Sequence, residues 1–151
     1  MLGKSNELLV IVDADALIAL SSTSDANHEK AKRILHFLST SHAAALFPTT
    51  AICEAVTVLR GRLNKPDGAS SLINKLQNGD LPVQAVDQET LLTAATLYHP
   101  LASKKNTLFD AVVAALAKQL NADAIFSFDG WYGKIGLSLA SDLLEQSKEA
   151  A

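Results

Sequence analysis

The chain has little of several features that would mark a specialised class of protein. Only one of its 151 residues is a cysteine, so an internal disulfide and a multi-cysteine metal site are excluded, and a reducing cytosolic setting is expected. No apolar run approaches the roughly 20 residues of a membrane span. Because no such run is present, a soluble intracellular protein is expected. Charged residues make up 19% and hydrophobic residues 48%, a balance that favours a folded domain over a disordered chain.

The charge balance gives no general attraction for nucleic acid. Thirteen Lys and Arg residues stand against 16 Asp and Glu residues, for a net charge of −3. A nucleic-acid substrate would therefore need a local basic patch or bridging metal ions. Two groups of basic residues could face phosphates, although solvated loop and helix-end charge is the more ordinary interpretation. They are Lys104 and Lys105, and Arg60, Arg62 and Lys65.

Several catalytic motifs are missing. The sequence has no G-x-x-x-x-G-K-[ST] phosphate loop and no G-x-G-x-x-G after a predicted strand. The four histidines show no spacing typical of a zinc site. Cys53 is expected to be a small buried residue and not a nucleophile.

Short apolar segments alternate with amphipathic segments along the chain. Residues 8–12 form a continuous apolar run rich in β-branched residues, typical of a strand buried on both faces. Further strands are predicted at 43–47, 81–86, 124–128 and, as a short last strand, 135–137. Helices are predicted at 14–20, 28–38, 51–62, 66–77, 88–97, 108–120 and from residue 140. The alternation predicts a single α/β domain over residues 1–151 with a mostly parallel sheet.

Two aspartates directly follow predicted strands. Asp13 comes after residues 8–12, and Asp129 comes after residues 124–128. Ligands of such sheets bind outside the carboxyl ends of the strands, so neighbouring strands would bring both carboxylates to one edge. Each aspartate on its own could equally be a turn residue or a helix cap.

Two further acids stand near the starts of predicted helices. Asp110 lies near the start of a predicted helix that is apolar almost all round, so partial burial is expected. Thr107 followed by Asp110 also resembles a capping box, which is the simpler explanation. Glu54 borders the apolar stripe of its helix, and it could also be a first-turn glutamate favoured by the helix dipole.

Taken together, the four acids suggest a metal site. Carboxylates that converge in one cleft raise one another's pKa, and a hard divalent cation removes that cost. Mg²⁺ and Mn²⁺ prefer oxygen ligands, and two such ions about 3.5–4 Å apart can support in-line hydrolysis of a phosphodiester.

The same residues carry a family resemblance. Residues 10–18, 52–55, 109–117 and 126–129 look like the four successive motifs of PIN domains, and the chain most closely resembles the single-domain VapC-type toxins of prokaryotic toxin–antitoxin systems. The similarity covers nearly the whole chain in order and spacing. It implies a three-layer α/β/α sandwich with a central, mostly parallel sheet, and a Mg²⁺- or Mn²⁺-dependent ribonuclease.

The resemblance also implies roles for individual residues. Ser127 stands where the family has a Thr or Ser that supports the site, and Asp15 stands where the family often has Asn, Ser or Thr. Asp15 is interpreted as a supporting residue, with a helix cap or a fifth carboxylate ligand as alternatives. The implied catalytic and metal-binding cluster is Asp13, Glu54, Asp110 and Asp129.

The segment after Asp129 departs from the family pattern. Gly130, Trp131 and Tyr132 replace a charged residue followed by an aromatic one. The two rings could stack on an unpaired base, but packing of the last loop against the sheet is the simpler expectation. The resemblance further implies a cytoplasmic homodimer, an RNA substrate and an antitoxin that blocks the cleft. The exposed side of the helices at 28–38 and 51–63 is a reasonable antitoxin surface.

Two other functions remain open at this point. A haloacid dehalogenase-like phosphatase would use Asp13 as a nucleophile, because Asp13-Ala14-Asp15 follows a buried strand, but no suitably placed lysine or later acidic pair is evident. A non-catalytic PIN-like binding module is the second alternative, although all four acids are retained.

Overall fold

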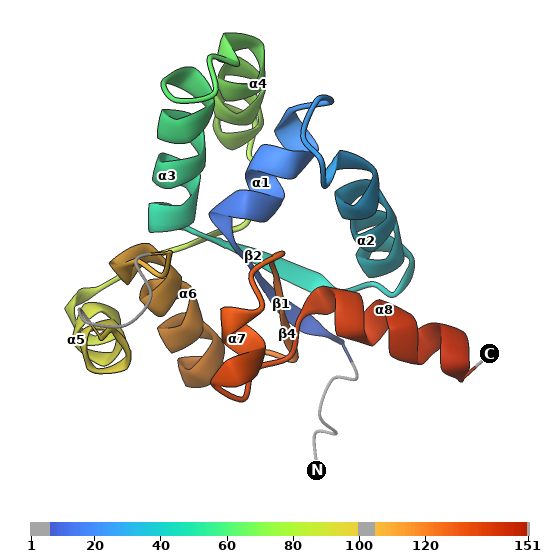
Figure 1. Ribbon diagram of the computed structural model, residues 1–151, viewed down its shortest axis with the longest axis vertical. Helices are drawn as coiled ribbons and strands as arrows, with labels where there is room; N and C mark the ends of the chain where they lie inside the picture. The colour runs from blue at the N-terminus through green and yellow to red at the C-terminus, as the bar shows by residue number, and fades with distance from the viewer. Residues whose placement is uncertain (1–6, 100–104, 151) are drawn as a thin grey trace.

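Strands and helices alternate along the chain, as Figure 1 shows. The computed structural model describes residues 7–99 and 105–150. Within them the strands are β1 (Leu9–Val12), β2 (Ala44–Pro48), β3 (Val83–Gln84) and β4 (Ala124–Phe126). The helices are α1 (Ala14–Ser21), α2 (His28–Thr40), α3 (Thr49–Arg60), α4 (Pro66–Gln77), α5 (Gln88–Leu97), α6 (Leu108–Gln119), α7 (Trp131–Lys134) and α8 (Ala140–Glu149).

The four strands form one parallel sheet in the order β3-β2-β1-β4. The chain first builds outward from β1 to β2 and β3, and then returns to place β4 on the other side of β1. The order of the strands therefore reverses between β1 and β4, and their carboxyl ends border the crevice where such sheets bind ligands.

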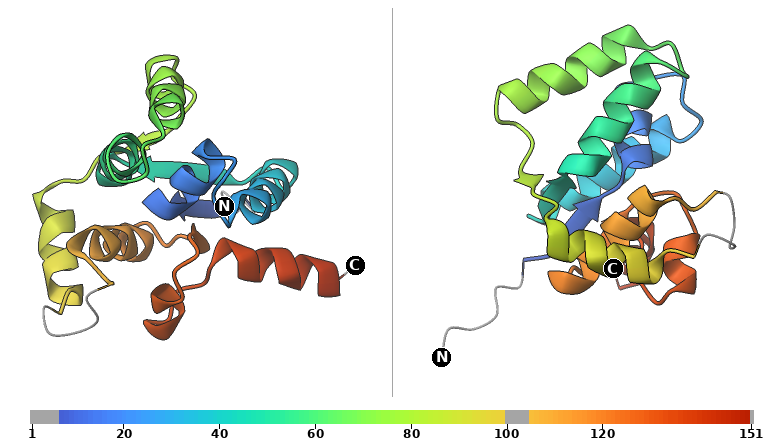
Figure 2. Two further views of the ribbon diagram at one scale, coloured as in Figure 1. Left: turned by 45° about the horizontal axis from the view of Figure 1, so that its top comes forward. Right: turned by 90° about the vertical axis from the view of Figure 1, so that its left-hand side faces the viewer.

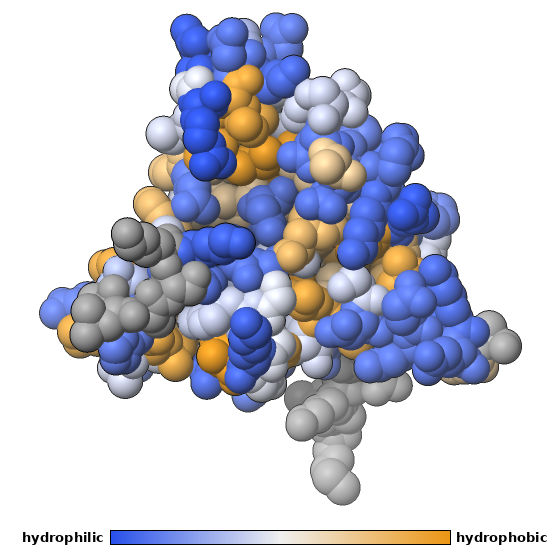
Figure 3. All heavy atoms as spheres, viewed as in Figure 1, coloured by the Kyte–Doolittle hydropathy of each residue, from blue (hydrophilic) through white to orange (hydrophobic). Residues whose placement is uncertain are grey.

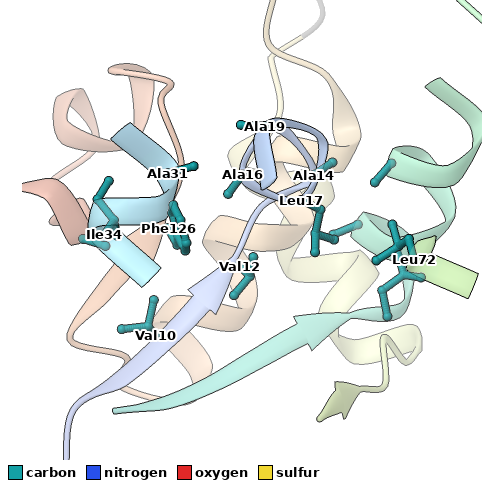
Figure 4. Close-up of a cluster of buried hydrophobic side chains, with 14 of the residues drawn as sticks. Val10, Val12, Ala14, Ala16, Leu17, Ala19, Ala31, Ile34, Leu72 and Phe126 are labelled. Carbon is teal, nitrogen blue, oxygen red and sulfur yellow. The ribbon is translucent and has the colours of Figure 1, made fainter. Parts of the chain in front are cut away.

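Helices cover both faces of the sheet, which gives three layers. Val10, Val12 and Phe126 face α1 and α2 on one side, as Figure 4 shows. Ile11 and Ile125 point to the other side, toward α5, α6 and α7. Figure 2 shows these two helix layers on opposite sides of the sheet. Because alternate residues of β1 are buried on opposite faces, the strand is apolar throughout, as the sequence predicts.

The predicted fold class is confirmed: this is an α/β/α sandwich, and every strand in the described residues is parallel. Helix α4 begins at Pro66 and ends at Gln77, where it was predicted. Asp87 caps α5, because its side chain accepts a hydrogen bond from Thr90 N. Among the described residues, no helix combines the length and the apolar character required to cross a bilayer.

Three local predictions are wrong. The strand predicted at 81–86 shrinks to Val83–Gln84 at the sheet edge. The strand predicted at 135–137 is absent, because the amides of Ile135 and Leu137 donate to the carbonyl of Tyr132 and close α7, a helix that the sequence did not predict. Cys53 is exposed, not buried. Ile52 and Ala55 lie on the buried side of α3, and Cys53 projects away from that side.

Candidate functional site

The candidate site lies where β1 and β4 end side by side. Val12 pairs with Phe126 in register, and Asp13 N donates a hydrogen bond to Phe126 O over 3.0 Å. The next residue of each strand therefore leaves the sheet at the same level. These residues are Asp13 and Ser127, and Asp129 follows two positions later.

Asp13 is buried and held by several donors. Its side chain is 3% exposed, and its Oδ1 accepts a hydrogen bond from Ala14 N over 2.7 Å, which caps α1. Its Oδ2 lies 2.9 Å from both Ser127 Oγ and Tyr132 Oη, each of which can donate to it. These contacts fix the plane of the carboxylate.

Ser127 connects Asp13 to Asp15. Its hydroxyl lies 3.1 Å from Asp15 Oδ2, which also accepts a hydrogen bond from Phe128 N over 2.9 Å. Ser127 Oγ itself accepts a hydrogen bond from Asp129 N over 3.1 Å. Asp15 Oδ1 is buried and has no hydrogen-bond partner. An unpaired buried carboxylate oxygen is costly, so this atom suits a site that a cation completes.

Asp129 is positioned by the loops on either side of it. Its Oδ1 accepts from Trp131 N over 2.9 Å, and its Oδ2 accepts from Asn106 Nδ2 over 3.0 Å. The Asn106 contact joins the β4–α7 turn to the start of α6. The carboxylate is therefore oriented from two parts of the chain.

Asp110 does form the predicted capping box, and it also faces the cleft. Its Oδ2 accepts from Thr107 N over 2.9 Å at the start of α6, while the side chain lines the same cavity as Asp13. The capping explanation and the site explanation therefore both apply to this residue. Glu54 lies in the second turn of α3 and is half-buried, so its first-turn interpretation is wrong.

One cleft collects the acids. It has a volume of about 280 Å³, and Figure 3 shows hydrophilic residues in the middle of this face, between α1, α3 and α6. Its walls bring together all four predicted ligands and the predicted supporting residue Asp15. Its charged lining residues are Asp13, Asp15, Glu54, Asp110, Asp129, Arg62 and Lys105.

The crowded carboxylates are electrostatically strained. Burial, and then the nearby charges of Asp15 and Asp110, raises the pKa of Asp13 well above its usual range. Burial also raises the pKa of Asp15 and that of Asp110. Burial, and then the charges of Asp110 and Asp15, raises the pKa of Glu54 to about 7, while Arg62 opposes that shift. A cation placed among them would reverse each of these shifts.

The donor set fits a hard divalent cation that keeps part of its water shell. Oxygen ligands from carboxylates and the orphaned Asp15 Oδ1 match the chemistry of Mg²⁺ or Mn²⁺. Within residues 7–99 and 105–150, no three Asp, Glu, His or Cys side chains are close enough together to hold an ion by themselves. An ion held by one or two carboxylates and several waters satisfies both observations.

Only some of the basic candidates reach the cleft. Arg62 and Lys105 line it, while Arg60 is exposed on α3 and Lys65 lines a separate surface pocket at the start of α4. Lys104 lies outside the described residues.

Two residues at the site were not predicted to act there. Tyr132 was expected to pack or to stack on a base, but it is fully buried and donates to Asp13. Burial raises the pKa of its phenol well above 10, so it stays protonated. Asn106 was also not predicted, because it contacts Asp129 across 23 positions of sequence and no local pattern indicates that contact.

Comparisons with known proteins agree with the fold described above. The sequence model of the PIN domain family matches residues 10–135. The fold is similar to the crystal structure of VapC20 from Mycobacterium tuberculosis, described as a toxin that cleaves the sarcin-ricin loop. The TM-score is 0.73 at 19% identity, covering 85% of this chain and 95% of that one. No curated protein sequence is significantly similar to the chain. Because the family model spans most of the chain and all four acids, the chain belongs to the PIN domain family.

Proposed function

We propose that the chain is a VapC-type endoribonuclease that hydrolyses RNA phosphodiesters at an acidic site with Mg²⁺ or Mn²⁺. The observation that carries the proposal is the single cleft into which five carboxylates from four separate segments converge. Such clustering is costly for stability without a cation, so it favours a binding function over a structural one. Asp13, Glu54, Asp110 and Asp129 would be the metal-binding and catalytic acids.

Each acid is held in place by different neighbouring groups. Asp13 is oriented by Ala14 N, Ser127 and Tyr132, and Asp129 by Trp131 N and Asn106. Asp110 is set by its cap, and Glu54 faces them from α3. When bound, the cations would supply positive charge that stabilises the phosphodiester oxygens and makes an attacking water more acidic, as in two-metal sites.

Two cationic side chains that line the cleft would attract the substrate. Arg62 and Lys105 lie on the cleft wall among the acids, where a phosphate next to the cleaved bond would pass. Because the net charge of the protein is −3, this local pair and the metal ions would carry most of the attraction for RNA.

The proposal extends to partners. We place the chain as the toxin of a toxin–antitoxin pair in the cytoplasm, acting as a homodimer and inhibited by an antitoxin that covers the cleft. The support is the similarity of fold to VapC20, whose own description names it a toxin.

The direct test is cleavage of single-stranded RNA by the purified chain. Cleavage is expected with Mg²⁺ or Mn²⁺ and is expected to stop when EDTA is added. Cleavage that persists in EDTA would contradict the metal-dependent mechanism. Titration with Mg²⁺ should also raise the melting temperature of the wild-type protein, and this stabilisation should vanish in Asp110→Asn.

Two further outcomes separate the alternative functions. A phosphatase of the haloacid dehalogenase type needs an accessible nucleophile, but Asp13 is 3% exposed and both of its oxygens accept hydrogen bonds. Trapping of a phosphate on Asp13 would nevertheless support that enzyme class. Metal binding with no RNA cleavage would favour a non-catalytic module.

A further inference from the structure

The phenol of Tyr132 occupies an unusual position. Tyr132 is fully buried in the layer that holds α5, α6 and α7. Its hydroxyl lies 2.9 Å from Asp13 Oδ2, although 119 positions of sequence separate the two residues. The ring packs at a tilt against Trp131, with a centroid separation of 5.2 Å. Packing would need only the ring, because a buried hydroxyl adds no apolar contact and requires a partner of its own.

Ser127 cannot replace this donor. Its hydroxyl has a single proton, but it lies within hydrogen-bonding distance of two acceptors, Asp13 Oδ2 at 2.9 Å and Asp15 Oδ2 at 3.1 Å. When Ser127 donates to Asp15, Asp13 Oδ2 keeps a side-chain donor only through Tyr132. The tyrosine therefore gives the Asp13 carboxylate a hydrogen bond that does not depend on the state of its neighbour.

The backbone around Tyr132 makes this contact rigid. The carbonyl of Tyr132 accepts hydrogen bonds from Ile135 N and Leu137 N over 3.2 and 3.0 Å. Asp129 lies three residues earlier, and its Oδ1 accepts a hydrogen bond from Trp131 N. The short helix α7 thus connects two acids of the cleft, Asp129 through its turn and Asp13 through the phenol.

We propose that Tyr132 is a positioning residue, whose phenol holds the Asp13 carboxylate in the orientation that a divalent cation needs. The inference rests on the proposed metal site but concerns a residue that is not itself a ligand. Outer hydrogen-bond partners of metal ligands typically change affinity by about 10–100-fold when they are removed. Loss of the Tyr132 hydroxyl alone should therefore weaken metal binding, while the ring that remains keeps the core packed.

The matched experiment uses the only two tyrosines of the chain. Tyr132→Phe removes the hydroxyl and keeps the ring, while Tyr98→Phe makes the same change at an exposed position after α5. Mn²⁺ binding is measured by calorimetry on the full chain, well below the melting temperature of each variant. We expect Tyr132→Phe to weaken Mn²⁺ binding by about tenfold and Tyr98→Phe to bind as the wild type does.

The outcomes are distinct. Equal Mn²⁺ affinity in Tyr132→Phe and the wild type would overturn the positioning role while leaving the metal site intact. A wild-type protein that binds no Mn²⁺ would overturn the metal site and this inference with it.

A second measurement needs no substitution at Tyr132. In protein labelled with 3-fluorotyrosine, Mg²⁺ should shift the ¹⁹F resonance of Tyr132 and leave that of Tyr98 in place, with Tyr98→Phe providing the assignment. An unmoved Tyr132 signal at saturating Mg²⁺ would contradict the proposal even if Tyr132→Phe does not fold.

Discussion

Ser127 Oγ lies 2.9 Å from Asp13 Oδ2, although 114 positions of sequence separate the two residues. The contact exists because Val12 and Phe126 are paired in neighbouring parallel strands. The same hydroxyl also reaches Asp15, so two carboxylates that repel each other compete for its single proton. The acids of the cleft therefore behave as one electrostatic unit.

Asp110→Asn should strongly reduce the rate of RNA cleavage without a matching loss of stability. The amide can still accept the cap hydrogen bond from Thr107 N, but it contributes no charge to a cation. We expect the cleavage rate to fall by about two orders of magnitude or more.

Asp142→Asn is the matched control for this change. Asp142 holds the equivalent cap position in α8, where its Oδ2 accepts from Leu139 N over 2.9 Å, but it lies outside the cleft. Thermal unfolding without metal should show Asp110→Asn to be no less stable than Asp142→Asn, which should keep full activity. Equal activity of the two variants would remove Asp110 from the site.

The metal-free fold should become less stable as the pH rises. Burial raises the folded-state pKa of Glu54 from its ordinary 4.5 to about 7, and the pKa values of Asp13 and Asp15 also rise. Between these values the folded state binds more protons than the unfolded state, so stability falls with pH. In EDTA the melting temperature should be higher at about pH 5 than at about pH 8. Mg²⁺ should restore stability at the higher pH.

Glu54→Gln isolates one part of this effect. The variant should show a shallower fall in melting temperature with pH, because one strained carboxylate is gone. Glu145→Gln, at an exposed position on α8, should follow the wild-type curve. A wild-type melting temperature that stays constant or increases from acidic to neutral pH would contradict the electrostatic strain.

Arg62→Gln should weaken RNA binding more than it slows the chemical step. Arg62 lines the cleft, whereas Arg60 is exposed near the same end of α3 and does not. The KM for single-stranded RNA should rise several-fold in Arg62→Gln and stay unchanged in Arg60→Gln. A plot of log affinity against log salt concentration has a negative slope, and the magnitude of this slope should decrease by about 0.7 for the lost phosphate contact. Similar behaviour of both variants would place the RNA elsewhere.

Gly68→Ala should destabilise the fold for a reason unrelated to the site. A Cβ at Gly68 would lie 2.6 Å from Ser21 O, where α4 packs against the end of α1. We expect a loss of about 1–3 kcal/mol in the free energy of unfolding. Gly133→Ala, which would meet no atom within 4 Å, should be neutral or slightly stabilising. Denaturant melts of the two variants provide the comparison, and equal stabilities would contradict the close approach.

Local pattern was sufficient for much of the framework. The apolar run that becomes β1 and the proline that begins α4 are short-range signals, and both elements were predicted. The four acids were predicted to meet because each one follows a predicted parallel strand or lies near the start of a predicted helix. Their presence in one cleft agrees with that reasoning, while their role as metal ligands stays a prediction.

Other features depended on contacts that no local pattern reports. Residues 135–137 have the composition of a strand, but their amides are used to close α7. Cys53 directly follows the buried Ile52, and only the rotation of the helix relative to the core makes it exposed. Arg62 and Lys105 were two of five basic candidates, and the sequence could not separate them from Arg60 or Lys65; the fold places them on the cleft wall.

The amino-acid sequence by itself determined which residues form strands and helices for most of the chain, and which acids stand at their ends, because hydrophobic periodicity and capping act over a few residues. Only the tertiary structure decided which donors hold those acids. Tyr132 contacts Asp13 across 119 positions, and such a contact arises from strand order and core packing, which act between segments far apart along the chain.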